Sequence, residues 1–259
     1  MWRPSLDPVR LATDVAGWRV EVVESTPSTN AVVSERARAD EPAGLVVTTE
    51  HQYAGRGRLD RGWQMPPRAG LALSVLVRPS ASTTSAAWSW LPLLTGVAVA
   101  ETVAALGIHS TVKWPNDVLV GELKICGILV ERVQTPSGPA AVIGIGLNTS
   151  LAADELPVPS ATSLSLQVGP VDRTQILLDL LDALGVQLRI WADDLELTQE
   201  IYRVHSATIG RRVEVQLPAG AILVGTATDV TADGRLIVHS VDGEEHTVAA
   251  GDVIHASLT

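Results

Sequence analysis

Hydrophobic residues recur at helical spacing in several parts of the chain. The longest such stretch follows Asp172, a typical helix N-cap residue, and its apolar side chains repeat three and four positions apart at Leu177, Leu180, Leu181, Leu184, Leu188 and Trp191. Because these positions share one face of a helix, they predict a long amphipathic helix packed on the core. Shorter helices are predicted over 6–15, from a cap at 28–30 to residue 39, and over 86–106, with a disturbance at Pro92.

Runs of Val, Ile and Leu bounded by Gly and Pro predict strands at 44–50, 71–77, 110–113, 118–120, 124–133 and 141–147. A loop rich in arginine and glycine, 55–63, separates the first two of these strands. Strands and helices alternate irregularly, which favours an α+β domain built on a mixed sheet flanked by helices.

The pattern of hydrophobic and polar residues changes after residue 209. Strand-like alternation continues without helical spacing over 211–217, 221–229, 235–240 and 245–248. Turn sequences separate these runs at Pro218-Ala219-Gly220, Asp233-Gly234 and Asp242-Gly243. We therefore expect a small all-β barrel at residues 207–259, behind a larger domain at residues 1–206.

Composition and charge exclude several classes of protein. The chain has 259 residues, of which 46% are hydrophobic and 19% are charged, and this balance is typical of a globular fold. A formal net charge of −10 argues against nucleic-acid binding, which needs a clustered cationic surface. The longest charge-free stretch, 79–100, is interrupted by Ser, Thr and Pro, so we expect no membrane span. The single cysteine, Cys126, and an N-terminus without an apolar signal core favour the cytoplasm.

Two polar segments indicate anion chemistry in this largely apolar chain. Residues 55–63 contain three arginines and three glycines, which supply guanidinium groups and close backbone N–H donors for phosphate or carboxylate. Residues 113–117, Lys-Trp-Pro-Asn-Asp, hold a lysine and an aspartate on either side of a rigid turn. Each segment also has a plain structural interpretation, as a solvated basic loop and as a strand-end turn, so neither identifies a function alone.

The order of the motifs narrows the interpretation. Together the motifs resemble those of the biotin protein ligases: Ser28-Thr29-Asn30, Glu50-His51-Gln52, Gly55-Arg56-Gly57-Arg58 to Trp63, Lys113 to Asp117, Lys124 to Glu131, Gly144 to Asn148, Ala161 to Leu164 and Gly251-Asp252-Val253. The resemblance runs from about residue 25 to the C-terminus. It implies a catalytic domain like that of the class II aminoacyl-tRNA synthetases, followed by an SH3-like barrel.

The resemblance also implies an activity, its substrates and a partner. Biotin would react with ATP and Mg²⁺ to give biotinyl-5′-AMP, and a lysine of a biotin carboxyl carrier protein or domain would then accept the biotinyl group. The short stretch before Ser28 leaves no room for the DNA-binding module that some members carry, so we expect a ligase without operator binding. The oligomeric state stays open between a monomer and a homodimer, and the metal ligands stay unassigned.

Site residues follow from the chemistry and from the matched motifs. A carboxylate that attacks a phosphate needs fixed cations around the reacting atoms. We expect catalytic roles for Arg58, Lys113, Asp117 and Lys124, with Asp117 as a general base for the incoming lysine. The resemblance places biotin and nucleotide at Ser28, Thr29, Asn30, Gln52, Gly55, Arg56, Gly57, Arg58, Arg61, Trp63, Lys113, Asn116, Lys124, Gly127 and Asn148.

Two positions depart from the family pattern, and other functions compete. Asp60 stands where glycine is usual, which bears on closure of the loop, and Cys126 stands where alanine is common, as a buried small side chain. The six histidines show no metal-ligand spacing. The alternatives are a lipoate or octanoyl ligase or transferase of related fold, a biotin-sensing DNA-binding repressor, and a protein that binds biotin without ATP chemistry.

Overall fold

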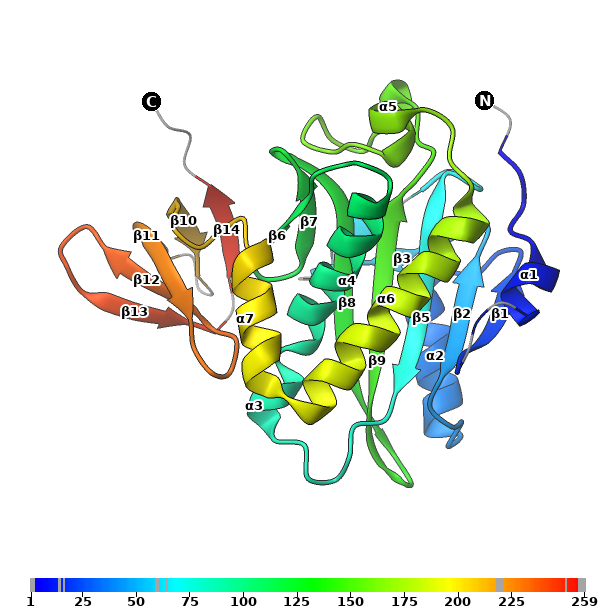
Figure 1. Cartoon of the computed structure of the whole chain (residues 1–259), viewed down its shortest axis with the longest axis horizontal. Helices are drawn as coiled ribbons and strands as arrows, with labels where there is room; N and C mark the ends of the chain where they lie inside the picture. The colour runs from blue at the N-terminus through cyan, green and yellow to red at the C-terminus, as the bar shows by residue number, and fades with distance from the viewer. Residues whose placement is uncertain are drawn as a thin grey trace.

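A seven-stranded mixed sheet forms the centre of this computed structural model, which describes residues 3–13, 15, 17–58, 61–63, 65–217, 221–249 and 251–255. The strand order is β1-β2-β5-β9-β8-β7-β6 (Figure 1). The strands are β1 (Arg19–Val23), β2 (Leu45–Thr49), β5 (Gly70–Val77), β6 (Thr111–Lys113), β7 (Asp117–Val120), β8 (Leu123–Thr135) and β9 (Gly138–Asn148). Among these strands only β1 and β2 pair in parallel, and the other neighbours in this sheet pair antiparallel.

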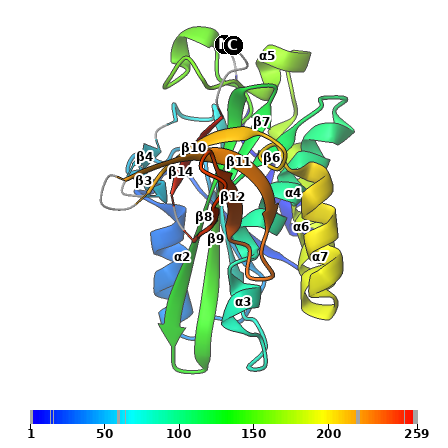
Figure 2. The same cartoon turned by 90° about the vertical axis from the view of Figure 1, so that its left-hand side faces the viewer.

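Helices cover both faces of the sheet (Figure 2). One face carries α2 (Thr29–Arg38), whose buried Val33 and Ala37 pack on Leu45 and Val142. The other carries α4 (Leu91–Ala105), α6 (Arg173–Asp193) and α7 (Leu195–His205), and the apolar stripe predicted after Asp172 is buried here. Short helices lie at α1 (Pro8–Thr13), α3 (Ser85–Trp88) and α5 (Leu164–Val168).

A separate five-stranded antiparallel sheet follows residue 211. Its order is β13-β12-β11-β10-β14, with the strands β10 (Arg212–Gln216), β11 (Ile222–Val230), β12 (Leu236–Ser240), β13 (Glu245–Val248) and β14 (Asp252–His255). This is the SH3-like unit expected from the turn sequences, although the turn at 218–220 lies outside the described residues. Two tryptophans connect it to the larger domain: Trp90, at the start of α4, donates Nε1 to Ala232 O at 2.9 Å, and Trp114, in the turn after β6, donates Nε1 to Gly234 O at 3.0 Å.

Several details differ from the sequence prediction. The helix expected over 86–106 is divided into α3 and α4, and Pro92 lies in the first turn of α4, where its missing N–H costs no hydrogen bond. The expected loop 55–63 contains a short hairpin, β3 (Gly55–Arg56) paired with β4 (Gly62–Trp63). The strands β1 and β14 and the helix α7 were not predicted. The first two are short and half-exposed, so their hydrophobic pattern is weak.

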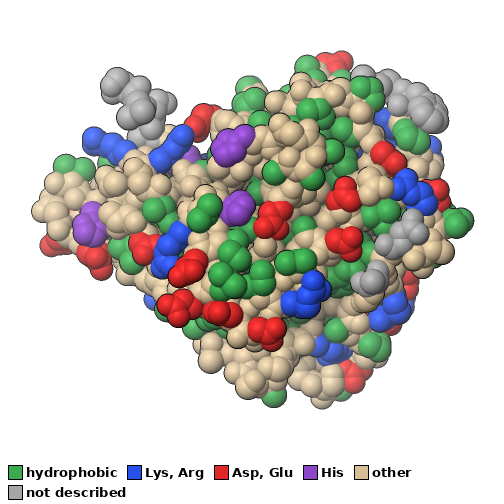
Figure 3. All heavy atoms as spheres, in the orientation of Figure 1, with side chains coloured by type: hydrophobic (Ala, Val, Ile, Leu, Met, Phe, Trp, Pro, Cys, Tyr) green, Lys and Arg blue, Asp and Glu red, His purple; other side chains and the backbone are tan. Residues whose placement is uncertain are grey.

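The charged surface and the burial of the most apolar helical stretch are both typical of a globular protein. Figure 3 shows acidic and basic side chains interspersed over the face that carries α6 and α7, which is typical of a solvated surface. By length and composition, the stretch Ser85–Ala105 meets the requirement for a membrane span, but 67% of its most apolar window is buried inside the molecule. Most of this stretch is α4, a core helix of this structure.

Candidate functional site

A cavity of about 520 Å³ lies over β8 and β9, between the 55–63 hairpin, the 113–117 turn and the start of β14. Every residue that the sequence assigned to the site lines this cavity, with the single exception of Gly55. A Cβ at Gly55 would lie 2.3 Å from Gln52 Nε2 and 2.5 Å from Trp63 O, so glycine is needed there for the hairpin to approach Gln52. Segments far apart in the sequence thus meet at one site.

A polar network forms one end of the cavity, at the start of α2. Gln52 Oε1 accepts from Thr29 N at 2.9 Å and lies 3.2 Å from Thr29 Oγ1. Ser74 Oγ lies 2.7 Å from Thr29 Oγ1 and 2.6 Å from Asn30 Oδ1, and Asn30 Nδ2 donates to Glu131 Oε2 at 2.6 Å. These mutual hydrogen bonds fix the side chains in a buried environment, as a binding surface requires.

Ser74 and Glu131 support this network, and the sequence analysis gave neither a role. Ser74 is fully buried and is the one polar residue of the strand Gly70–Val77. A lone hydroxyl in an otherwise apolar strand was therefore a usable signal. Glu131 belongs to a recognised motif, but only the tertiary structure brings it to Asn30, because β8 and α2 lie far apart in the chain.

A strip without side chains crosses the floor of the cavity. Gly127 of β8 and Gly146 of β9 are direct cross-strand partners, and Gly144 lies two residues before Gly146, on the same face of the sheet. A Cβ on Gly144 would lie 2.2 Å from Asn30 Oδ1, and one on Gly146 would lie 2.5 Å from Trp63 Cε2. The glycines therefore let Asn30 and the tryptophan ring lie directly on the sheet.

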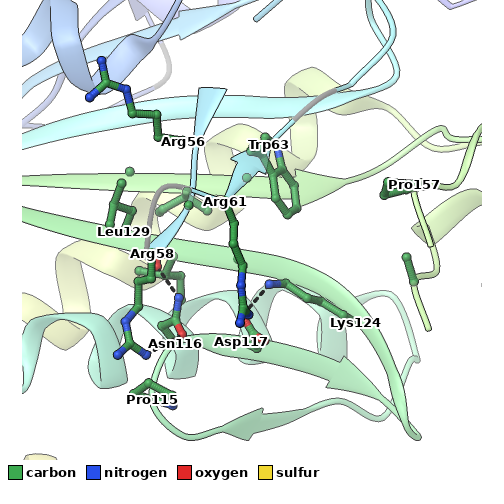
Figure 4. Close-up of a pocket in the computed structure, with 18 of the residues that line it drawn as sticks. Arg56, Arg58, Arg61, Trp63, Pro115, Asn116, Asp117, Lys124, Leu129 and Pro157 are labelled. Carbon is green, nitrogen blue, oxygen red and sulfur yellow. Dashed lines mark hydrogen bonds and ion pairs between the residues drawn. The ribbon is translucent and has the colours of Figure 1, made fainter. Parts of the chain in front are cut away.

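Trp63 covers this strip from the hairpin side (Figure 4). Lys124 Nζ lies 5.7 Å from the centroid of its ring, in the range of a cation–π contact. Its indole Nε1 is buried and has no hydrogen-bond partner in the described part of the chain. A buried donor without a partner is costly, so this atom is available to a ligand.

Charged groups converge near the middle of the cavity (Figure 4). Lys124 Nζ lies 2.6 Å from Asp117 Oδ1 and forms an ion pair with it. Burial lowers the pKa of the Lys113 ammonium below its ordinary value, an effect that Asp117 opposes and Lys124 reinforces. Two lysines and one carboxylate thus leave a net positive charge that an anion can neutralise.

The hairpin contributes three arginines with different surroundings. Arg58 Nη1 donates to Asn116 Oδ1 at 3.3 Å, and burial lowers the pKa of the Arg58 guanidinium. Asn116 is itself held by donating Nδ2 to Ile128 O at 2.7 Å. Arg61 forms an ion pair with Asp252 of β14. Arg56 is exposed and points away from the other charged groups, although it also lines the cavity.

The wall at the other end of the cavity was not predicted. Pro157, Val158 and Ala161 line it, on the segment that follows β9 (Figure 4 labels Pro157). This segment is tied to β8, since Lys124 N donates to Ser160 O at 2.7 Å. Asn148 lies nearby and donates Nδ2 to Thr162 O at 2.9 Å. Only Ala161 belonged to a recognised motif, and no periodicity marks a wall of this kind.

The remaining sequence predictions concern metal binding and the two positions that depart from the family pattern. Among the described residues, no group of three His, Cys, Asp or Glu side chains is placed to hold a metal ion. Cys126 is fully buried, and burial raises the pKa of its thiol, which agrees with its prediction as a small core residue. Asp60 lies outside the described residues.

Comparison with known proteins gives consistent matches along the chain. Residues 22–148 match the model of the Biotin/lipoate A/B protein ligase family, and residues 208–256 match that of the Biotin protein ligase C terminal domain. The biotin–(acetyl-CoA-carboxylase) ligase of Mycobacterium tuberculosis is 40% identical over 263 residues, with 98% of this chain and 97% of the relative covered.

Solved structures show the same similarity. The biotin protein ligase of Aquifex aeolicus in complex with biotin and ATP aligns with a TM-score of 0.79 at 24% identity, over 92% of this chain and 99% of that one. The biotin protein ligase of Leishmania major in complex with biotinyl-5-AMP aligns with a TM-score of 0.60 at 25% identity, over 90% and 99% of the two chains.

Proposed function

This chain belongs to the biotin protein ligases, and we propose that it activates biotin with ATP and transfers it to a biotin carboxyl carrier protein. In the first step the biotin carboxylate attacks the α-phosphorus, and pyrophosphate leaves. In the second step the ε-amine of the carrier lysine attacks the carbonyl of biotinyl-5′-AMP, releases AMP and loses a proton. The observation that supports this proposal most directly is that the polar end, the glycine strip and the cationic centre line one continuous cavity.

Biotin occupies the polar end in this proposal. Its ureido ring needs both donors and acceptors, and Ser28, Thr29, Asn30 and Gln52 supply hydroxyl and amide groups of both kinds. The network through Ser74 supports the proposal, because hydrogen bonds fix these side chains before a ligand arrives. The glycine strip then leaves space for the apolar part of the ligand against the sheet.

The carboxylate and the α-phosphate meet at the cationic centre. Lys113 and Lys124 would balance the charge that builds up when two anions approach, and Arg58 would add a planar donor from the hairpin. A phosphate offsets the burial cost that lowers the pKa of Lys113, so nucleotide binding favours its charged form. Asp117 then accepts the proton of the carrier lysine.

The nucleotide occupies the end bounded by Trp63, Asn148 and Pro157. Trp63 offers an apolar face and an unpaired Nε1 donor, and Asn148 is anchored by its hydrogen bond to Thr162. Magnesium fits here as an ion bound mainly by ATP phosphates. The cavity carboxylates Asp117 and Asp252 already pair with Lys124 and Arg61, and the described residues hold no three-ligand cluster. The ion would supply charge neutralisation on the phosphates.

We further propose that residues 1–206 and 207–259 work as two domains that share the site. The two family matches, over 22–148 and 208–256, support this division. The second domain contributes Asp252 to the hairpin arginine Arg61 and thereby helps to close the cavity. Closure keeps water from the mixed anhydride.

The test is a reconstituted labelling reaction. The protein is incubated with ATP, Mg²⁺, biotin and a carrier domain, and we expect the carrier to gain the mass of one biotinyl group on one lysine. Pyrophosphate release before the carrier is added reports the first step. Labelling by lipoate but not by biotin would contradict the proposal, and so would biotin binding without pyrophosphate release.

A further inference from the structure

The segment before α1 reaches across the edge of the molecule to the loop that follows β9. Arg3 donates twice to Ser150 O, from Nε at 3.1 Å and from Nη2 at 2.8 Å, and its Nη2 also forms an ion pair with Glu155. The Arg3 side chain is only 11% exposed. In Figure 1 this segment runs from α1 toward the side that carries α5. Arg3 is therefore packed into the structure and is not a solvated surface side chain.

The segment is itself anchored to the body of the protein. Leu6 N donates to Glu50 Oε1 at 2.6 Å, and Arg173 Nη2 donates to Pro4 O at 2.8 Å. Glu50 and Arg173 are almost fully buried and form an ion pair at 2.5 Å. Both residues of this buried pair also bind the backbone on either side of Ser5. The backbone next to Arg3 is therefore fixed in position.

The two residues before the turn 152–155 are held by other contacts, because Ser150 N donates to Ala69 O at 2.7 Å and Leu151 O accepts from Ser163 Oγ at 2.9 Å. In the described part of the chain, the turn itself has few restraints besides its own hydrogen bonds and Arg3. Glu155 Oε2, which meets Arg3, also accepts from Ala152 N at 2.9 Å and so closes the turn 152–155. Below the loop, Leu151 and half-buried Leu156 belong to a small apolar cluster separate from the main core. A small cluster contributes little burial free energy, so polar contacts carry more of the loop's order.

The turn closed by Glu155 leads directly into the cavity wall. Pro157 and Val158 follow Glu155 by two and three residues, and both line the cavity. In Figure 4, Pro157 lies on the far side of Trp63 from Arg56, at the end that the proposed function gives to the nucleotide. A displacement of the turn 152–155 would therefore move this wall.

We propose that Arg3 is a positioning residue for the nucleotide end of the site, acting through Ser150 and Glu155 on the wall formed by Pro157 and Val158. The inference rests on the proposed function for the identity of the ligand. Among the described residues, the hydrogen bonds and the ion pair of Arg3 reach Ser150 and Glu155, which do not line the cavity. Its effect is to hold the wall in the conformation that accepts the adenosine part of ATP. Biotin, at the opposite end, is unaffected by this restraint.

The test compares Arg3→Ala with a matched control, Arg10→Ala. Arg10 is also an arginine near the N-terminus, and it pairs with the carboxylate of Asp172 at 2.9 Å, away from the cavity. We expect Arg3→Ala to raise the KM for ATP by about 3- to 10-fold and to change the KM for biotin by less than about 2-fold. Arg3→Lys, which keeps the charge, should recover part of the loss, and Arg10→Ala should behave as the wild type.

Hydrogen exchange gives a readout that needs no activity. In the ligand-free protein, Arg3→Ala should speed amide exchange over 150–158 and leave β5 and β9 unchanged. An active Arg3→Ala variant with wild-type KM for ATP and wild-type exchange would overturn the inference. So would an equal rise in both KM values together with a lower Tm, which indicates a general loss of stability. A wild-type protein that forms no adenylate would instead contradict the proposed function, and the exchange result would still stand by itself.

Discussion

The Asp117–Lys124 pair is the residue contact that most directly links this structure to the proposed chemistry. Asp117 ends the 113–117 turn and Lys124 lies at the start of β8, and Lys124 Nζ lies 2.6 Å from Asp117 Oδ1. An anion that binds Lys124 would compete with Asp117 for the ammonium group. The carboxylate would then be available as a base at the time when the adenylate is present.

Asp117→Asn tests this role. The amide keeps the shape of the side chain and removes its ability to accept a proton from the carrier lysine. We expect transfer from preformed biotinyl-AMP to slow by about 10²- to 10⁴-fold, which is the usual contribution of a general base. The measurement is single-turnover transfer to the carrier after rapid mixing.

Glu122→Gln is the matched control for that variant. Glu122 is an exposed carboxylate in the adjacent turn and pairs with Arg211 at 2.7 Å. Its loss should leave the transfer rate within about 2-fold of the wild type, because exposed ion pairs contribute little. Unchanged transfer in Asp117→Asn would remove the general-base role and leave Asp117 as a partner of Lys124 only.

At the scale of elements, the hairpin of β3 and β4 is held in place by its arginines. The two strands pair at Gly55–Trp63 and Arg56–Gly62, and Gly57 N donates to Arg61 O at 2.6 Å. An isolated hairpin this short is marginally stable in water. Its position over the cavity therefore depends on the Arg58–Asn116 and Arg61–Asp252 contacts, which reach the 113–117 turn and β14.

Arg61→Ala should loosen this hairpin and let biotinyl-AMP escape. The Arg61 side chain is 65% exposed, so solvent screens its ion pair and we expect release to speed by no more than about 5-fold. Asp252→Asn should have the same effect, and the exchanged pair Arg61→Asp with Asp252→Arg should restore retention. The measurement is the dissociation rate of labelled adenylate without carrier.

Arg203→Ala serves as the control for hairpin opening. Arg203 pairs with Asp229 at 2.8 Å, also links a helix to the second sheet, and lies away from the cavity lining. Adenylate release should match the wild type. Equal release from Arg61→Ala and Arg203→Ala would show that the Arg61–Asp252 contact does not hold the hairpin closed.

At the scale of the whole molecule, the two sheets meet through a relay from the 113–117 turn to β14. Trp114 N donates to Thr208 Oγ1 at 3.0 Å, and Thr208 Oγ1 lies 3.2 Å from His255 Nε2. Because the hydroxyl already accepts from Trp114, its own proton is free for a neutral His255 ring. Burial, with Lys113 and Arg211 nearby, lowers the pKa of His255 from 6.5 to about 4, against an opposing effect of Glu122.

This depressed pKa predicts a loss of stability in mild acid. Between pH 6.5 and about 4 the unfolded chain protonates His255 and the folded chain does not, so the unfolded state binds more protons. The free energy of unfolding should fall as the pH drops through this window and should gain nothing from His255 above it. Since the neighbouring Arg211 and Glu122 are partly exposed and screened, we expect a contribution on the order of 1–2 kcal/mol.

Urea denaturation of His255→Gln from pH 4.5 to 7.5 measures this contribution. Glutamine can accept from Thr208 without titrating, so the variant should lose less stability than the wild type toward pH 4.5. His239→Gln is the control, because His239 is half-exposed and faces Glu245 at 3.1 Å at the far side of the small sheet. Parallel pH dependence in the wild type and His255→Gln would exclude the relay as a source of acid sensitivity.

Much of the fold could be predicted from periodicity and turn residues. The stripe after Asp172, the strands at β2, β5, β8 and β9, and the change to short antiparallel strands after residue 209 all have strong local patterns. Weak local patterns caused some of the misses. This holds for the strands β3 and β4, which contain two residues each. The helix α7 is different, because its residues have a clear amphipathic pattern and its sequence carried a usable signal.

The features of the site likewise separate into those that the sequence predicted and those that it did not. The sequence by itself determined which residue types and motifs were present, and the order of those motifs identified the family, because glycine, arginine and lysine at fixed spacing carry their chemistry locally. The tertiary structure alone decided the partners: Ser74 with Asn30, Asp117 with Lys124, Asp252 with Arg61, and Arg3 with Glu155. Three of these pairs join residues more than forty positions apart, and Asp117 and Lys124 meet only because β7 and β8 pair antiparallel. Such contacts depend on how strands and helices pack, and no local pattern encodes that packing.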